Sequence, residues 1–327
     1  MSAIDPIRMG DGLIRKLSAG QYRQPRNDQK GQAAHYSDDP TLAIYRIRNY
    51  KDGNKWSTTT MIDILGCNED CAHCFVPVAA LRGDLNSAYV KMMLSRLPGS
   101  LKGKATHQAG DIYAEITKRM RNRSEALEGQ VIELTGGEPT LYRAGLLELS
   151  RLASQDTITV AINTNGLLIG TDEKYLDAFS GFEGNVQFSV SPKGITPEEF
   201  RRFTDAKQEY FETPFVAYAR ILERGFKAFL SVHLDTLAFP EELEQEDNPV
   251  ERLRTRIESI KPGAFSGIIW DRMRTHMFSN KYDDAEAKMV ARGYWKRDAE
   301  GKIVKRTDGK KVKNYIDGQK RFSNSAL

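Results

Sequence analysis

The sequence predicts an α/β fold in which a parallel sheet lines a polar cavity. Six strand-like segments alternate with amphipathic helical segments along the 327 residues, the order typical of parallel β-α-β units. Short connections favour right-handed crossovers, which suit an open doubly wound sheet or a full or partial barrel. Active sites in all of these folds gather at the carboxyl ends of the strands, where this chain places its unusual residues.

The six strands are predicted from runs of apolar and β-branched residues that end in glycine or turn residues. They cover 55–65, 130–140, 157–166, 185–194, 226–237 and 265–270. A further strand at 43–50 precedes the first of them, and the turn Asp52-Gly53 predicts that the two form a hairpin.

The helices are predicted from apolar residues that recur every three or four positions. They cover 86–97, 111–123, 141–153, 171–181, 213–225 and 249–261. Asp111 is expected to cap the second helix, and the fourth is expected to start at Thr171 and stop at Gly181. A short additional helix starts at Thr196, with Pro197 in its first turn and Glu199 completing a capping box.

Two of the strands alternate between apolar and polar residues. In 185–194, Val186, Phe188 and Val190 share one face, and Gln187, Ser189 and Ser191 share the other. In 226–237, Ser231, His233 and Asp235 share one face in the same way. Strands with helices outside and a polar cavity inside show this mixture, so His233 and Asp235 are candidate residues for contact with a substrate.

Three regions are predicted from composition. Residues 1–55 form an N-terminal arm and the first hairpin strand, 56–278 the core barrel, and 279–327 a basic C-terminal appendage resembling a β-hairpin. Residues 287–322 hold twelve Lys or Arg against four Asp or Glu. Such a segment is a solvated surface or a docking site for a nucleic acid or an acidic protein.

The composition favours a cytoplasmic protein without membrane contact. Hydrophobic residues make up 40% and charged residues 28% of the chain. No apolar run approaches the roughly 18 residues that span a bilayer, and the N-terminus lacks a secretory signal. Clustered cysteines in a reducing compartment bind metal or perform redox chemistry more often than they form disulfides.

The chain's three cysteines, Cys67, Cys71 and Cys74, lie within eight residues at the end of the 55–65 strand. Thiolates hold iron–sulfur clusters, and three of them leave one iron of a cubane open for a substrate or co-substrate. A structural zinc site uses four protein ligands, so the alternative is zinc held together with His73 or His233.

The spacing Cys-x3-Cys-x2-Cys resembles the signature of the radical S-adenosylmethionine (radical SAM) superfamily. "GGEP" (136–139), "TNG" (164–166) and "SVSPKG" (189–194) follow in that family's order. The resemblance implies a partial (β/α)6 barrel with a [4Fe–4S] cluster on the three cysteines. It also implies S-adenosylmethionine (SAM) beside Gly136, Gly137, Glu138, Asn165, Ser189, Ser191 and Lys193, and an electron donor such as flavodoxin or ferredoxin.

Three functions are consistent with these features. The stretch 189–234 looks like activase-like members of the family, which act on a partner protein. The second hypothesis is a radical enzyme that modifies a nucleic-acid base or a small metabolite and uses the basic segment as its docking surface. A non-catalytic zinc-binding module is the third.

Overall fold

The computed structural model describes residues 39–52, 55–72, 74, 76–122, 126–233, 248–271, 290 and 295–305. The predicted arm therefore lies almost entirely outside the described residues. His73 and Asp235 lie outside them as well, as does most of the basic segment.

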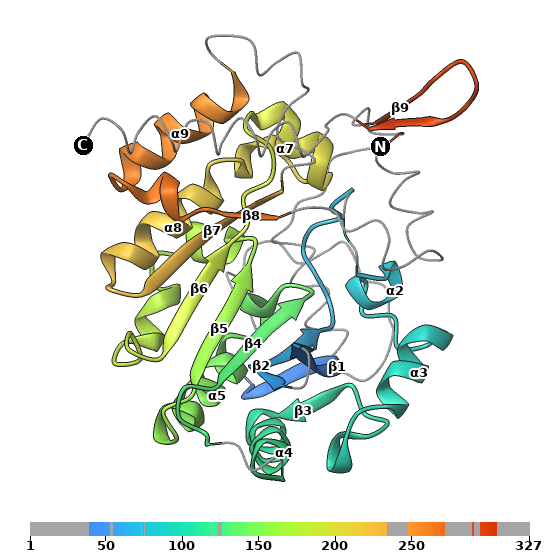
Figure 1. The fold of residues 1–327 in the computed structure, drawn as a ribbon, viewed down its shortest axis with the longest axis vertical. Coiled ribbons are helices and arrows are strands. Elements are labelled where there is room, and N and C mark those ends of the chain that lie inside the picture. Colours follow the sequence, from blue (N-terminus) through green and yellow to red (C-terminus); the bar gives the residue numbers. More distant parts are fainter. Residues whose placement is uncertain are drawn as a thin grey trace, which may run out of the picture.

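The described strands form one eight-stranded sheet and a separate two-stranded hairpin (Figure 1). Six strands of the large sheet are parallel and lie in the order β2-β4-β5-β6-β7-β8. They are Lys55–Ile64 (β2), Val131–Gly136 (β4), Thr159–Thr164 (β5), Val186–Val190 (β6), Lys227–His233 (β7) and Ile269–Asp271 (β8). The predicted partial (β/α)6 barrel is confirmed.

Two antiparallel strands extend the sheet at the β2 edge. β1 (Thr41–Asp52) pairs with β2 as the predicted hairpin, and β3 (Thr106–Gln108) pairs with β1. The sequence predicts no strand between the helices 86–97 and 111–123, so β3 is absent from the prediction. This strand is only three residues long and shows no alternation of apolar residues. It is a strand because it pairs with β1.

The helices lie in the connections between strands and around the sheet (Figure 1). They are Val78–Leu81 (α2), Ala88–Ser95 (α3), Ala109–Asn122 (α4), Arg143–Gln155 (α5), Leu167–Thr171 (α6), Pro197–Thr204 (α7), Thr213–Glu223 (α8) and Pro249–Ile260 (α9). The predicted cap of α7 is present, because Thr196 Oγ1 accepts a hydrogen bond from the Glu199 N–H at 3.1 Å. The Glu199 carboxylate accepts from the Ile195 N–H at 2.9 Å and so completes the box one residue earlier.

The predicted helix starts at Asp111 and Thr171 are wrong. Asp111 lies in the first turn of α4 and is not its cap, since the helix begins at Ala109. The predicted helix 171–181 is replaced by α6, which ends at Thr171, and by a 3-10 turn at Tyr175–Phe179. Gly166 adopts a left-handed conformation with φ 80° and starts α6 directly after β5, so the helix comes before Thr171 rather than after it.

The alternation in the strands separates a helix-covered face from a cavity face. Val186, Phe188 and Val190 are buried, whereas Gln187 and Ser189 between them are half-buried. The same pattern along β7 leaves Ser231 and His233 half-buried. The apolar face packs into one core with the helices, and the polar face points to the interior of the barrel.

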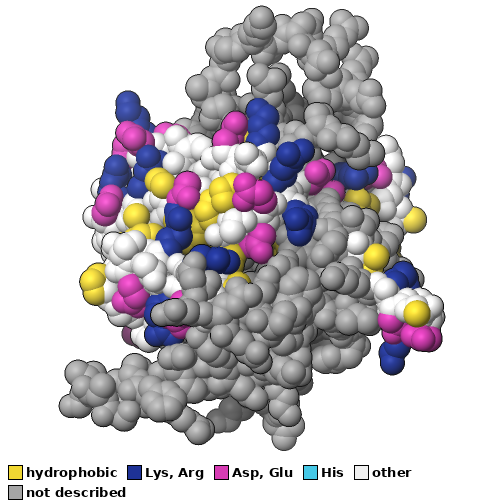
Figure 2. Space-filling model, turned by 90° about the horizontal axis from the view of Figure 1, so that it is seen from above, with side chains coloured by type: hydrophobic (Ala, Val, Ile, Leu, Met, Phe, Trp, Pro, Cys, Tyr) yellow, Lys and Arg dark blue, Asp and Glu magenta, His cyan; other side chains and the backbone are white. Residues whose placement is uncertain are grey.

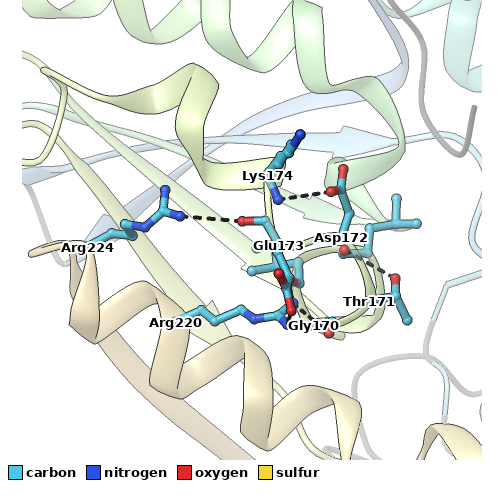
Figure 3. Close-up of polar contacts among 9 residues, drawn as sticks. Gly170, Thr171, Asp172, Glu173, Lys174, Arg220 and Arg224 are labelled. Carbon is cyan, nitrogen blue, oxygen red and sulfur yellow. Dashed lines mark hydrogen bonds and ion pairs between the residues drawn. The ribbon is translucent and has the colours of Figure 1, made fainter.

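Arg220 joins α8 to the end of α6 (Figure 3). Its guanidinium donates to the carbonyl oxygens of Ile169 and Gly170 at 3.0 and 2.7 Å and pairs with Glu173 at 3.2 Å. A cation at the carboxyl end of a helix satisfies carbonyl groups that have no partner inside the helix. This contact fixes α6, and with it the β5 turn that borders the cavity.

The surface outside the core carries mixed charge. In the view from above, Lys and Arg side chains of the described residues are interspersed with Asp and Glu (Figure 2).

Two short strands near the C-terminus, Trp295–Arg297 (β9) and Ile303–Lys305 (β10), pair as an antiparallel hairpin. They lie in the segment for which the sequence predicts a hairpin-like appendage. Among the described residues no helix is both long and apolar enough to cross a membrane.

We expect Asp63→Asn to destabilise the protein by about 3 kcal/mol, because it removes a buried anion that pairs with two half-buried guanidinium groups. The Asp63 carboxylate is fully buried on β2 and accepts from Arg46 and Arg48 of β1, the latter at 3.0 and 3.1 Å. Denaturant unfolding measures the loss. The control is Asp177→Asn, which breaks an exposed pair with Arg224 and should cost at most about 1 kcal/mol. Equal effects would show that Asp63 does not hold β1 onto β2.

Candidate functional site

The three cysteines lie on the loop that follows β2, and neighbouring elements hold its backbone. The N–H of Cys67 donates to the Leu81 carbonyl at 2.9 Å. The N–H groups of Asp70 and Ala72 donate to the carbonyls of Thr204 and Phe203, at the end of α7, at 3.1 and 2.8 Å. Three backbone hydrogen bonds, to the ends of α2 and α7, therefore hold the loop that carries the thiols.

None of these three described cysteines forms a disulfide, and all three line one cavity at the carboxyl ends of the parallel strands. Cys71 is buried, and Cys67 and Cys74 are half-buried. Burial, followed by the nearby Glu69 carboxylate, raises the pKa of Cys67 and Cys71 well above the usual thiol range. A thiolate at such a position needs a bound cation, and metal binding releases the proton.

The cavity brings together every predicted site residue that the structure describes. Besides the cysteines, its lining includes Gly136, Gly137, Glu138, Asn165, Ser189, Ser191, Lys193 and His233. Each of them follows a strand or lies in the last two residues of one, as expected for a site at this edge of a parallel sheet. Asp235 lies outside the described residues.

The Gly136-Gly137-Glu138 segment is bonded to the cysteine loop. The N–H of Gly137 donates to the Ile64 carbonyl at 2.9 Å, and the N–H of Glu138 donates to the Gly66 carbonyl at 2.8 Å. A Cβ atom on Gly137 would lie 1.9 Å from the Gly66 oxygen. Glycine at this position is therefore required by the approach of the two backbones.

The Glu138 carboxylate is enclosed by the protein. One oxygen accepts from the Thr140 N–H, the Thr140 hydroxyl and the Thr164 hydroxyl at 3.1, 2.6 and 2.7 Å. The other accepts from the Asn165 N–H at 2.8 Å. The pKa of Glu138 is raised above its usual value, because the effect of burial exceeds that of these hydrogen bonds, which lower it. The side chain thus fastens β4 to β5, and its acceptor capacity is largely used inside the protein.

Asn165 connects this network to the cysteine loop. Its Nδ2 donates to Asn68 Oδ1 at 2.7 Å, and its Oδ1 accepts from the Leu167 N–H at 3.1 Å. Asn68 lies between Cys67 and Cys71 and is fully buried. Asn165 therefore orients the loop from the end of β5.

Polar residues on β6, after β6 and on β7 also line the cavity. Lys193 is buried, and its ammonium donates to the Ser191 hydroxyl. Ser189 lies one strand away from Asn163, to which it is paired in register. His233 is half-buried at the end of β7. The wall thus offers a cation, two hydroxyl groups and an imidazole.

Sequence reasoning missed Glu69 as a site residue. It is 2% exposed, lines the cavity, and accepts a hydrogen bond from the Cys71 thiol at 3.2 Å. Burial raises its pKa to about 7, and Lys193 is the largest influence that lowers it. A glutamate between two cysteines reads as an ordinary solvated loop residue, so no signal in the sequence distinguishes it.

Thr135 and Asn163 also line the cavity and were not among the predicted site residues. Asn163 Nδ2 donates to Glu133 Oε1 at 2.7 Å, linking the cavity wall to a half-buried carboxylate of β4. Each follows a buried apolar residue, Leu134 or Ile162, so the two-residue period of β4 and β5 could have placed both on the cavity face.

The residues present fit an iron–sulfur cluster and a polar co-substrate. Two buried polar atoms of the loop, Asn68 Nδ2 and Glu69 Oε1, have no hydrogen-bond partner among the described residues, as expected if a polar group binds there. Within the described ranges, no three His, Cys, Asp or Glu are grouped closely enough to hold a single metal ion. A cubane spaces its cysteine ligands more widely than one ion does.

Comparisons with known proteins agree with this site. A family model described as the radical SAM superfamily matches residues 61–251. A search of curated protein sequences gives no significant match.

Solved structures show more distant likeness. TYW1 with a lysine–pyruvate adduct bound has a TM-score of 0.41 and 15% identity, covering 75% of this chain and 78% of that one. Streptococcus suis SuiB has a TM-score of 0.39 and 14% identity, covering 67% of this chain and 49% of that one, so the chain spans about half of SuiB. Archaeal TYW1 has a TM-score of 0.35 and 12% identity, with coverages of 75% and 77%.

Proposed function

Because the chain belongs to the radical SAM superfamily, we propose that Cys67, Cys71 and Cys74 hold its [4Fe–4S] cluster in this cavity. The observation that supports the assignment is the convergence of all three thiols on one cavity at the strand ends. Three thiolates ligate three irons and leave the fourth for SAM. Because this superfamily consists of enzymes, we no longer consider the hypothesis that the chain is a non-catalytic zinc-binding module.

When bound and reduced, the cluster supplies the electron that cleaves SAM to a 5′-deoxyadenosyl radical, which abstracts hydrogen from a substrate. The chain's own residues bind and orient the reactants. Lys193 and Ser191 offer a cation and a hydroxyl to the carboxylate of SAM, and the Gly136-Gly137-Glu138 backbone lies beside the open side of the cysteine loop. His233, across the cavity, is our candidate for contact with the substrate, together with Asp235.

A protein is the substrate class that we propose first, in the manner of activase-like members. The support is the resemblance of residues 189–234 to those members. A nucleic-acid base is the second candidate, favoured by the excess of eight positive charges (twelve against four) in residues 287–322. RNA binding that weakens steeply with salt would favour the nucleic acid, and a labelled partner protein after turnover would favour the activase.

We expect anaerobically reconstituted protein to bind about four irons and four sulfides per chain. With SAM and a strong reductant it should form 5′-deoxyadenosine and methionine even without substrate. Iron and sulfide analysis, electron paramagnetic resonance of the reduced protein and chromatography of the nucleoside measure these outcomes. A protein that takes up zinc in place of iron and forms no 5′-deoxyadenosine would contradict the proposed function.

A further inference from the structure

We propose that the Tyr45 hydroxyl donates a hydrogen bond to a sulfur atom of the cluster, on the side held by Cys74, and thereby raises the reduction potential of the cluster. The proposal rests on the proposed function, in which the three cysteines hold a [4Fe–4S] cluster. Tyr45 lies on β1, before the residues 61–251 that match the family model. The contact is therefore a feature of this chain and not of the motifs that it shares with the family.

The backbone of β1 is irregular at Tyr45. Ile44 pairs with Ile64 of β2. Two positions later, Arg46 pairs with Asp63, which is only one position from Ile64. Tyr45 is thus the extra residue of a β-bulge, which interrupts the alternation of the strand and can re-aim a side chain. In keeping with this bulge, the Arg46 guanidinium lies over the ring of its neighbour Tyr45, 5.8 Å from the ring centroid.

The Tyr45 hydroxyl is buried without a hydrogen-bond partner among the described residues. The whole side chain is buried, so water cannot take the place of a partner. By contrast, the buried Tyr142 hydroxyl donates to the Leu65 carbonyl at 2.8 Å. The fully buried Tyr175 hydroxyl donates to the Thr140 carbonyl at 2.8 Å. A buried hydroxyl without a partner is costly, so Tyr45 calls for an acceptor that the described residues do not supply.

The groups around the phenol place it beside the cysteine loop. Burial, followed by Asp63, raises the pKa of Tyr45 well above the usual phenol range, so the hydroxyl keeps its proton and is a donor. Tyr89 and the Cys74 thiol contribute to the same rise, and Cys74 lines the cavity. The sulfur atoms of a cluster held by Cys74 therefore provide the acceptor that the described residues lack.

A hydrogen bond to a cluster sulfur favours the reduced state, because the added electron increases the negative charge that the donor meets. Hydrogen bonds to the sulfur atoms are among the factors that set the potential of a cluster. The proposal thus assigns Tyr45 to control of the electron transfer and leaves the binding of SAM to the residues of the cavity wall.

The test compares the reduction potential of the wild type with that of Tyr45→Phe, both with a reconstituted cluster and without SAM. Phenylalanine keeps the ring and removes only the hydroxyl. We expect the equilibrium constant for reduction to fall about tenfold, which for a one-electron couple is a shift of about 59 mV to more negative potential. A redox titration followed by electron paramagnetic resonance measures it. Metal-free Tyr45→Phe should unfold at the same denaturant concentration as metal-free wild type or a higher one, because the lost hydroxyl had no acceptor.

The matched control is Tyr175→Phe, because Tyr175 is equally buried but its hydroxyl has an acceptor in the protein. This variant should leave the reduction potential unchanged. It should lower the denaturant concentration at which the metal-free protein unfolds, because the Thr140 carbonyl loses its donor. The two variants therefore separate a hydroxyl that serves the cluster from one that serves the fold.

An unchanged potential in Tyr45→Phe with a full cluster would overturn the proposal. A loss of metal-free stability as large as that of Tyr175→Phe would overturn it too, because the hydroxyl would then have an acceptor in the protein. If Tyr45→Phe takes up too little iron, Tyr45 is replaced by a fluorinated tyrosine, whose more acidic hydroxyl is a stronger donor. That protein should have a less negative potential than the wild type, and an unchanged potential would again contradict the proposal. Failure of the proposed function looks different, because the wild type would then form no [4Fe–4S] cluster to titrate.

Discussion

Replacing Cys71 by serine should reduce bound iron from about four atoms per chain to less than about one, and should abolish cleavage of SAM. Cys71 is the most buried of the three thiols, and the backbone on either side of it is bonded to the end of α7. A serine hydroxyl is a much weaker iron ligand than a thiolate, so the cluster should not assemble. Iron and sulfide analysis after anaerobic reconstitution measures the loss.

The control for this variant is Asp70→Asn, a change in the same loop at a side chain that is not among those lining the cavity. It should retain the cluster. Metal-free Cys71→Ser should unfold at nearly the same denaturant concentration as metal-free wild type, since cysteine and serine are close in size. Metal-free Asp70→Asn should do so as well, since aspartate and asparagine are also close in size. A full, stable cluster in Cys71→Ser would show that the set of ligands is wrong.

The features that were predicted correctly depend on short-range pattern. The inward and outward faces of β6 follow from a two-residue period, and the start of α7 follows from Thr196 and Glu199 three residues apart. The cysteine loop is likewise a local motif. Its meeting with the ends of β4, β5 and β6 follows from the parallel order of the strands, because their carboxyl ends lie on one edge.

Features that depend on contacts between distant segments could not be predicted in this way. Asn68 and Asn165 are 97 positions apart and meet through a single hydrogen bond. Local rules also compete with one another. Thr171 and Gly181 satisfy the rules for a helix start and stop, yet the glycine turn after β5 begins α6 at Leu167, and Thr171 ends it. Such preferences are weak beside tertiary packing.

Glycine at position 137 shows the same limit at the site itself. From the sequence, Gly137 is expected to let SAM approach the backbone. In the structure, the space that a Cβ atom would take is filled by the Gly66 carbonyl, one residue before Cys67. The residue that the motif marks for the cofactor is thus also required for the position of the cysteine loop.

We therefore expect Gly137→Ala to impair both the cluster and the fold. The added carbon would lie 1.9 Å from the Gly66 oxygen and 2.9 Å from the Ile64 oxygen, so the end of β4 must move away from the cysteine loop. That movement breaks the hydrogen bonds from the N–H groups of Gly137 and Glu138. Overpacking of this kind costs about 3 kcal/mol in a tightly packed region. The free energy of unfolding of the metal-free protein, measured with denaturant, should decrease. The iron content after reconstitution should decrease as well.

Gly110→Ala is the matched control, because it adds the same methyl group in α4, where no heavy atom lies within 4 Å of the new carbon. It should stabilise the protein by about 0.5 to 1 kcal/mol, since alanine is the better helix residue. If Gly137→Ala keeps its stability and iron content but loses affinity for SAM, the backbones can separate without harm. The requirement for glycine would then come from the cofactor alone, as the sequence by itself suggests.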